Sequence, residues 1–400
     1  MIDEPSGDDG ADFIVRVAEG LKDIEPAVWD ALADPDGTKD ALPHPFTRHA
    51  FLSSLEDSGS VGGRTGWLPQ HLLLEDADGQ LLAAVPAYLK GHSQGEYVFD
   101  HGWADAFERA GGRYYPKLQV SVPFTPATGP RLLVGGGAEA TVLRGAMVSA
   151  LSGYVRQTGV SSAHATFLQE ADLEPMLEAG FLHRTDQQFH FVNRGYATYD
   201  DFLDTLASRK RKGLRKERRE ALAAGITIER LSGSDISEEA LDAFFAFYMD
   251  TGNRKWGRPY LNRAFFRLVT ERMAEAIVLV MARRDGCYIA GALNFVGGDR
   301  IFGRYWGCTE DHPFLHFEVC YHQAIDYAIE HKLSIVEAGA QGEHKLARGY
   351  EPVITHSAHD IAHPGLRSAI EDYLERERRH VLLAQPELAA ATPFRRGEVE

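Results

Sequence analysis

The fold of this chain is decided by the stretch IVLVMARRDGCYIAGALNF, residues 277–295. Two apolar runs of strand length flank Asp285-Gly286, a dipeptide that is typical of tight hairpin turns. The stretch therefore predicts an antiparallel β-hairpin.

The first half of the chain repeats the same scheme. Residues 71–88, HLLLEDADGQLLAAVPAY, place an Asp-Gly turn between two apolar strands. In each half the hairpin is followed by an amphipathic helix, a short strand and a second helix. These later elements are expected at residues 138–157, 163–167 and 171–179, and again at residues 317–331, 334–338 and 364–380. Hairpins first and helical crossovers later predict an α/β (α+β) fold with mixed, largely antiparallel sheets flanked by helices.

The domain organisation follows from this repeat and from the length of the chain. A chain of 400 residues, 44% of them hydrophobic, is long for a single domain. We expect two copies of one fold, joined near Gly195. The predicted parts are a disordered acidic N-terminus at residues 1–12, a first domain at 13–193 and a second domain at 194–400, which carries the active site.

The composition predicts a soluble, cytoplasmic protein. No apolar run is long enough for a membrane span, and the acidic start of the chain is unlike a signal peptide. Three cysteines without CxxC spacing (Cys287, Cys308 and Cys320) are expected to be reduced and mostly buried. The oligomeric state stays open.

A histidine-rich segment at residues 356–363 resembles a metal site at first sight. Residues 355–361 read as a strand, however, and in a strand His356 and His359 point to opposite faces. Because metal ligands must converge, no metal site is expected.

A dense cationic run, SRKRKGLRKERR at residues 208–219, contrasts with the formal net charge of −16. An acidic surface repels long polyanions, so this local cluster suits a small phosphorylated ligand better than a duplex. A helix is predicted from Tyr199 through the run to Gly225, with a break near Ser208 or Gly213. The candidate phosphate contacts are Lys210, Lys212, Arg215 and Arg219. The alternative is that the run is a solvated helix face.

Several segments resemble those of a known family in amino-acid sequence. They are YYPKLQ at residues 114–119, PFTPATGPR at 123–131, NRKWGRPY at 253–260 and EAGAQGEHKLARGY at 337–350. The order of elements resembles the acyl-CoA N-acyltransferase (GNAT) fold in tandem. Together, order and segments resemble the FemAB-like predicted N-acyltransferases, a peptidoglycan biosynthesis and recognition family.

The resemblance implies an N-acyltransferase that moves an acyl or aminoacyl group to an amine acceptor. Its partners would be a small phosphorylated acyl donor and an amine, with acyl-CoA or aminoacyl-tRNA as co-substrate and no tightly bound cofactor. FemAB-type enzymes carry a Phe-Lys loop after the last core strand, and residues 343–350 occupy that place with His344 at the aromatic position. In this loop Lys345 and Arg348 are candidate substrate contacts. The donor stays open because residues 304–307, RYWG, lack the second glycine of the GNAT phosphate loop.

The candidate catalytic residues surround the segment DHPFLHFEVCYH, residues 311–322. Glu318 and His322 lie four apart on the predicted helix, so the carboxylate can orient or charge the imidazole, and a structural surface pair is the alternative. Tyr305 is a further candidate at a strand end, as are Glu337, Gln341 and Glu343. Cys320 is expected to be a buried thiol and not a nucleophile.

Two other functions remain as alternatives. One is an aminoacyl-tRNA-dependent transferase that acts on peptidoglycan precursors. The other is a non-catalytic module that binds cell-wall fragments or tRNA through residues 209–219, although the run lacks interleaved aromatic residues. The Pro-rich segment at residues 122–130 is expected to form either a rigid loop bordering a pocket or an edge-strand connector.

Overall fold

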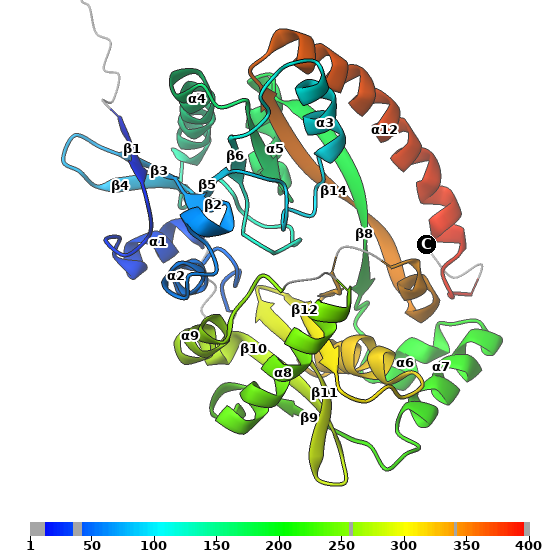
Figure 1. Cartoon of the computed structure of the whole chain (residues 1–400). Coiled ribbons are helices and arrows are strands. Elements are labelled where there is room, and N and C mark those ends of the chain that lie inside the picture. Colours follow the sequence, from blue (N-terminus) through cyan, green and yellow to red (C-terminus); the bar gives the residue numbers. More distant parts are fainter. Residues whose placement is uncertain (1–12, 35–41, 256–258, 340–341, 396–400) are drawn as a thin grey trace, which may run out of the picture.

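The computed structural model describes residues 13–34, 42–255, 259–339 and 342–395 of the chain. Figure 1 shows two layered α/β halves that are joined by strands running between them. The predicted N-terminal segment, residues 1–12, lies outside the described residues.

The described residues form one sheet of eleven strands and one of three. The large sheet has the order β2-β5-β6-β7-β14-β8-β13-β12-β11-β10-β9, and the small one has the order β1-β3-β4. The large-sheet strands are β2 (Trp67–Pro69), β5 (Ala87–Lys90), β6 (Lys117–Val120), β7 (Ser162–Thr166), β14 (Tyr350–Ile361), β8 (Leu182–Val192), β13 (Ile335–Glu337), β12 (Arg300–Cys308), β11 (Cys287–Gly297), β10 (Ile277–Arg284) and β9 (Thr227–Leu231). The small-sheet strands are β1 (Ile14–Ala18), β3 (His71–Glu75) and β4 (Leu81–Val85).

Helices cover both faces of the large sheet (Figure 1). In the first half they are α1 (Pro26–Ala33), α2 (His49–Asp57), α3 (His101–Arg109), α4 (Ala140–Thr158) and α5 (Glu170–Glu178). In the second half they are α6 (Tyr199–Asp204), α7 (Ser208–Ala221), α8 (Glu238–Lys255), α9 (Arg263–Met273), α10 (Leu315–Phe317), α11 (Gln323–Glu330) and α12 (Pro364–Ala390). A π-helical turn, η4 (Glu318–His322), joins α10 to α11, and a 3-10 helix, η5 (Glu343–Arg348), precedes β14.

The predicted fold class is confirmed. Both Asp-Gly hairpins form, as β3–β4 and β10–β11, and the predicted helix, strand and helix follow each of them. The large sheet is mixed and largely antiparallel, since the parallel pairs are β6–β7 and β12–β13. The first hairpin nevertheless joins the small sheet with β1, whereas the second lies in the large sheet.

The two halves share backbone hydrogen bonds. Strand β14, from the second half, lies between β7 and β8 of the first half, and β8 also pairs with β13. A common hydrophobic core crosses the same boundary, where the Phe46 ring makes edge contacts with Phe295 and Phe302 at centroid distances of 5.3 and 5.1 Å. The predicted boundary near residue 193 therefore divides a single continuous sheet.

The predicted break in the basic helix is confirmed. Thr198 caps α6 and forms a capping box with Asp201, so the N-cap lies one residue before the predicted Tyr199. Residues 205–207 separate α6 from α7, and Gly225 adopts a left-handed conformation with φ 73° after the second helix.

The cysteine prediction is only partly correct. Cys287 is exposed, whereas Cys308 and Cys320 are half-buried. In β14, His356 pairs with His183 while His359 pairs with His164, so the two histidines point to opposite faces as predicted. Within the described part of the chain, no cluster of three or more His, Cys, Asp or Glu side chains could hold a metal. No helix there is long and apolar enough to cross a membrane.

Candidate active site

A wedge opens in the large sheet where β12 separates from β13. The two strands pair in parallel over three residues each, with Phe302 opposite Glu337 as the last pair. β13 ends there, whereas β12 continues to Cys308. On its other edge β12 pairs with β11 through an irregularity that leaves Arg304 as an extra residue, because Gly303 and Tyr305 face consecutive residues of β11. Such a bulge bends the strand and widens the opening.

A cavity of about 160 Å³ occupies this opening, and we call it the wedge cavity. Its walls come from β11, β12, the segment that follows β13, and the α10–η4 segment. The lining residues are Ala292, Asn294, Gly303, Arg304, Tyr305, Trp306, His316, Cys320, Tyr321, Ala338 and Gly339. The predicted catalytic residue Tyr305 is thus in the cavity wall.

The Pro-rich segment at residues 122–130 is a loop that borders the wedge cavity. This was one of the two structures predicted for it; the other was an edge-strand connector. The main-chain carbonyl of Phe124 accepts hydrogen bonds from the Arg304 guanidinium and from the Tyr305 hydroxyl, the latter at 3.4 Å. Burial raises the pKa of Tyr305 to about 12. The hydroxyl is therefore a neutral hydrogen-bond donor near pH 7.

Lys345 lies behind the rim of the wedge cavity. Its side chain is buried, with 1% of the residue exposed, and Nζ donates a 2.8 Å hydrogen bond to the carbonyl of Gly339, a lining residue. Burial lowers the pKa of Lys345 to about 8. The structure thus places a cation with a lowered pKa beside the cavity.

Glu318 and His322 do not form the predicted pair. Arg218 donates two hydrogen bonds to the Glu318 carboxylate, from Nε at 3.0 Å and from Nη2 at 2.9 Å. The carboxylate beside His322 is Glu217, whose Oε1 lies 2.9 Å from Nε2, while Nδ1 lies 2.7 Å from the Tyr199 hydroxyl. The buried Glu318 carboxylate gains more from a forked, permanently charged guanidinium than from an imidazole, which explains this choice of partner.

Arg348 is held within the protein by the same glutamate. Nε and Nη2 donate to the two carboxylate oxygens of Glu217 at 2.8 and 2.7 Å, and Nη1 donates to the carbonyl of His344. Burial acts to raise the pKa of Glu217, but the hydrogen bonds from His322 and Arg348 outweigh it and lower the pKa. Glu217 therefore ties α7 to η4 and to η5.

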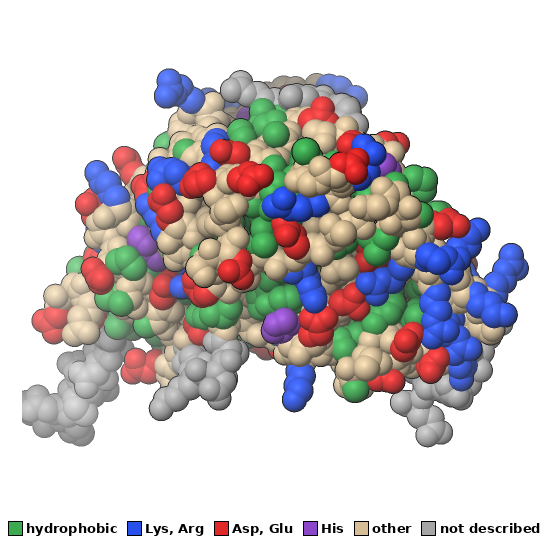
Figure 2. All heavy atoms as spheres, turned by 90° about the horizontal axis from the view of Figure 1, so that it is seen from below, with side chains coloured by type: hydrophobic (Ala, Val, Ile, Leu, Met, Phe, Trp, Pro, Cys, Tyr) green, Lys and Arg blue, Asp and Glu red, His purple; other side chains and the backbone are tan. Residues whose placement is uncertain are grey.

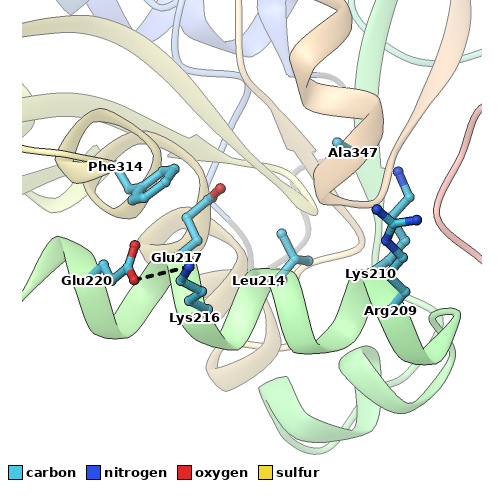
Figure 3. Close-up of a pocket in the computed structure, with 9 residues that line it drawn as sticks. Arg209, Lys210, Leu214, Lys216, Glu217, Glu220, Phe314 and Ala347 are labelled. Carbon is cyan, nitrogen blue, oxygen red and sulfur yellow. Dashed lines mark ion pairs between the residues drawn. The ribbon is translucent and has the colours of Figure 1, made fainter.

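A second cavity, of about 560 Å³, lies between α7 and the neighbouring turns, and we call it the basic groove (Figure 3). It is lined by Arg209, Lys210, Gly213, Leu214, Lys216, Glu217, Glu220, Phe314 and Ala347. Figure 2 shows Lys and Arg side chains gathered at the end of the molecule where α7 lies. Of the four predicted phosphate contacts, Lys210 lines this groove.

The other three predicted contacts lie elsewhere on α7. Lys212, Arg215 and Arg219 are exposed and follow the i, i+3, i+7 spacing of a single helix face, which is turned away from the groove. Arg215 is paired with Asp200 at 2.7 Å. Arg209 and Lys216, which do line the groove, were not predicted from the sequence, because a charge run alone does not show which helix face meets the rest of the protein.

The basic groove and the wedge cavity are neighbours. Phe314 lines the groove and lies two residues before His316, which lines the wedge cavity. Ala347 lines the groove and lies two residues after Lys345. The turn before η4 and the helix η5 thus form a shared wall.

Two polar side chains at these cavities stand out in the sequence. Glu217 is the one acidic residue in the run 208–219, and Asn294 is an amide within the apolar strand of the second hairpin. Glu337 is buried beside Arg300 at 2.9 Å, and burial raises its pKa to about 7 although Arg300 opposes the shift. Gln341 and the side chain of Glu343 lie outside the described part of the chain.

Comparison with solved structures shows that the chain shares the fold of FemX. FemX matches over 87% of this chain and 98% of its own length, with 14% identity and a TM-score of 0.53. The C-terminal domain of a putative lysylphosphatidylglycerol synthetase from Agrobacterium fabrum matches over 87% of this chain and 94% of its own, with 11% identity and a TM-score of 0.52. A tandem GNAT protein from the clavulanic acid biosynthesis pathway covers 88% of this chain and 99% of its own at 13% identity, with a TM-score of 0.43.

Comparison with sequences reaches the level of the family. No curated protein gives a significant match. The model of the FemAB-like family, described as peptidoglycan biosynthesis/recognition, matches residues 20–396. Because this match spans nearly the whole length, the chain belongs to the FemAB-like family.

Proposed function

We propose that this protein transfers an acyl or aminoacyl group from an activated, phosphorylated donor to an amine acceptor in the wedge cavity. The observation that carries the proposal is the cavity between β12 and the end of β13, with the buried Lys345 ammonium bonded to its lining residue Gly339. Family membership and the fold shared with FemX support the same class of reaction.

The chemistry requires few groups from the protein. The acceptor ammonium first loses a proton to solvent, and its neutral nitrogen attacks the donor carbonyl to form a tetrahedral oxyanion. The oxyanion then collapses, the bond to the leaving oxygen or sulfur breaks, and the second proton of the nitrogen passes to the leaving group. A buried cation whose charge stays constant during the step can stabilise that oxyanion. With a pKa of about 8, Lys345 is mostly protonated at pH 7. Its ammonium lies just behind the lining, bonded to the Gly339 carbonyl, and in this proposal it turns into the cavity to serve as the donor.

The basic groove supplies the site for the donor's phosphate groups. Arg209, Lys210 and Lys216 bring three cations to the groove wall, where Lys216 also pairs with Glu220 at 3.5 Å. Phe314, which is 37% exposed, adds an aromatic ring. A nucleotide tail with phosphates and a base matches this combination. Acyl-CoA and aminoacyl-tRNA both end in such a tail, so both are candidate co-substrates.

Glu318 and His322 act from behind the site in this scheme. Neither residue lines the wedge cavity or the basic groove, and both are buried in contacts with α7. We propose that they hold α10 and η4 in position and that Tyr305 contacts the substrate.

The test is a transfer assay with two donor classes. Purified protein is incubated with acyl-CoA or with aminoacylated tRNA, together with cell-wall precursor peptides that carry a free amine, and the products are identified by mass spectrometry. One donor class should be consumed with a new amide formed. Replacing Lys345 by Met should lower kcat by roughly 100-fold or more, because one oxyanion donor contributes about that much.

A matched control separates catalysis from charge loss. Lys212→Met removes the same charge from the outer face of α7 and should leave kcat unchanged. A Lys345→Met protein with full activity, or failure of both donor classes with wild-type protein, contradicts the proposed function.

A further inference from the structure

The wall of the basic groove contains two carboxylates among its cations. Arg209, Lys210 and Lys216 are joined there by Glu217 and Glu220. A negative charge in this wall repels the phosphate groups of a donor, so a carboxylate there lowers the affinity for the donor. Glu220 pairs with Lys216 on α7 itself, and 39% of its side chain is exposed, whereas the Glu217 side chain is 11% exposed (Figure 3). The more buried carboxylate therefore calls for an explanation other than binding.

Glu217 is bonded to two segments that build the wedge cavity. Arg348 of η5 donates hydrogen bonds to both carboxylate oxygens, at 2.8 and 2.7 Å, and Nε2 of His322 in η4 lies 2.9 Å from Oε1. The segment η4 supplies part of the cavity lining, and η5 contains Lys345. A single carboxylate in the wall of the basic groove is thus connected to the walls of the wedge cavity.

Arg348 transmits the position of Glu217 to Lys345. The guanidinium carbon of Arg348 lies 3.4 Å from the centre of the Phe317 ring, and Nη1 donates to the carbonyl of His344 at 2.7 Å. Lys345 and Arg348 are three residues apart in the 3-10 helix η5, so their side chains leave the helix on the same side. The ion pair between Glu217 and Arg348 therefore fixes η5 and, with it, the position of the Lys345 ammonium.

We infer that Glu217 is a positioning residue for the proposed transfer: through its bonds to η5 and η4 it holds Lys345 at the wedge cavity, although its charge weakens binding of the donor's phosphates. This inference rests on the proposed function and adds a residue to it. It also makes Arg348 a positioning residue where the sequence predicted a substrate contact. Removal of the Glu217 charge has opposite effects in the two cavities, because phosphates bind more tightly in the groove while transfer slows in the wedge.

The test compares binding and turnover in two matched variants. Glu217→Gln and Glu220→Gln each remove one carboxylate from the groove wall at nearly equal volume. With the full chain, calorimetry gives the dissociation constant of inorganic pyrophosphate, and the transfer assay gives kcat. Both variants should bind pyrophosphate roughly 3-fold more tightly, since a like charge is removed. The loss of kcat should be roughly 10-fold larger in Glu217→Gln than in Glu220→Gln, because a small displacement of a catalytic group slows the reaction.

A third variant, Arg348→Gln, breaks the same link from the side of η5. It removes the guanidinium but leaves the Glu217 charge in the groove wall. The value of kcat should fall as in Glu217→Gln, whereas pyrophosphate should bind no more tightly than to wild-type protein. The double variant Glu217→Gln, Arg348→Gln should be no slower than the slower single variant, because residues that act as a unit do not lose rate additively.

The reactivity of Lys345 gives a measurement that does not depend on turnover. Its Nζ is bonded to the carbonyl of Gly339 and the residue is 1% exposed, so acetic anhydride should acylate it slowly in wild-type protein. In Glu217→Gln and Arg348→Gln the labelling of Lys345, followed by mass spectrometry, should be roughly 5-fold faster, because a loosened segment opens to solvent more often. Glu220→Gln keeps η5 bonded to Glu217 and should label at close to the wild-type rate.

The outcomes separate the inference from the proposed function. Wild-type labelling of Lys345 in Glu217→Gln overturns the inference, as does an equal loss of kcat in Glu217→Gln and Glu220→Gln, while transfer by wild-type protein leaves the reaction standing. If wild-type protein consumes neither donor class but labelling responds as described, the proposed function fails and the hold of Glu217 on Lys345 stands. Should Glu217→Gln not fold, Arg348→Gln decides the inference by the same measurements.

Discussion

Lys345 shows how much chemistry a single buried residue can add to this site. Its ammonium donates a hydrogen bond to the Gly339 carbonyl and has almost no contact with solvent, so burial lowers its pKa from the ordinary range to about 8. The charged form is needed to stabilise an oxyanion. In the proposed reaction, the contribution of Lys345 is therefore present below pH 8 and is lost as the pH rises through about 8.

This titration gives a prediction for the pH dependence of kcat. Wild-type protein should lose activity on the alkaline side with an apparent pKa near 8. In Lys345→Arg the guanidinium stays charged to much higher pH, so that alkaline decline should move upward or vanish while some activity remains. A pH–rate profile measured between pH 6 and 10 checks this, and an unchanged alkaline decline in Lys345→Arg would assign the titration to another group.

Sequence spacing could not predict the partners of individual residues. The i, i+4 spacing of Glu318 and His322 suggested a contact between them. In the structure Glu318 binds Arg218 and His322 binds Glu217, and these two partners are adjacent residues of α7. Those contacts join residues about one hundred positions apart, and tertiary contacts of that kind leave no local pattern. The loop position of Lys345, by contrast, was found from the sequence because the family motif marks it.

At the scale of elements, α7 divides its charges between two faces. Arg209, Lys210 and Lys216 line the basic groove, whereas Lys212 and Arg219 are exposed on the opposite side. The composition of the run correctly predicted a cationic helix with a break before it. The face that meets a ligand depends on how α10 and η5 pack against α7, which the run itself does not encode.

This division predicts unequal effects of equal charge changes. Lys210→Glu combined with Lys216→Glu should weaken binding of the phosphorylated donor by roughly 10- to 100-fold, because two direct or near contacts are lost. Lys212→Glu combined with Arg219→Glu makes the same change in net charge on the outer face, where solvent and salt screen it. Dissociation constants and melting temperatures of both double variants check this. Equal losses of affinity would show that only the overall field of α7 matters.

At the scale of the whole molecule, the two halves repeat the same order of strands and helices, but backbone hydrogen bonds join them into one sheet. Both hairpins and the elements after them were predictable from local patterns of apolar residues and turns. The insertion of β14 between β7 and β8 was not, since those strands are joined across more than 150 residues of chain. In the structure, β8 has both of its neighbours, β13 and β14, in the second half.

The shared sheet predicts that the first half does not fold alone. A fragment of residues 13–193 would expose both edges of β8 and one edge of β7, so it should lack a cooperative thermal transition. Joining residues 350–395 to that fragment through a flexible linker restores β14 and α12 and should recover part of the transition. Circular dichroism on heating measures both, and cooperative unfolding of the 13–193 fragment by itself would support two separable domains.

The wedge cavity as the place of acyl transfer is tested most directly by a crystal structure with a hydrolysis-resistant analogue of the donor that the transfer assay identifies. The electron density should show the acyl carbonyl between β12 and Gly339, within hydrogen-bond distance of Lys345 Nζ, and the phosphates beside Lys210 and Lys216. Density for the acyl group outside the wedge cavity, with Lys345 still bonded only to Gly339, would contradict this assignment of the active site.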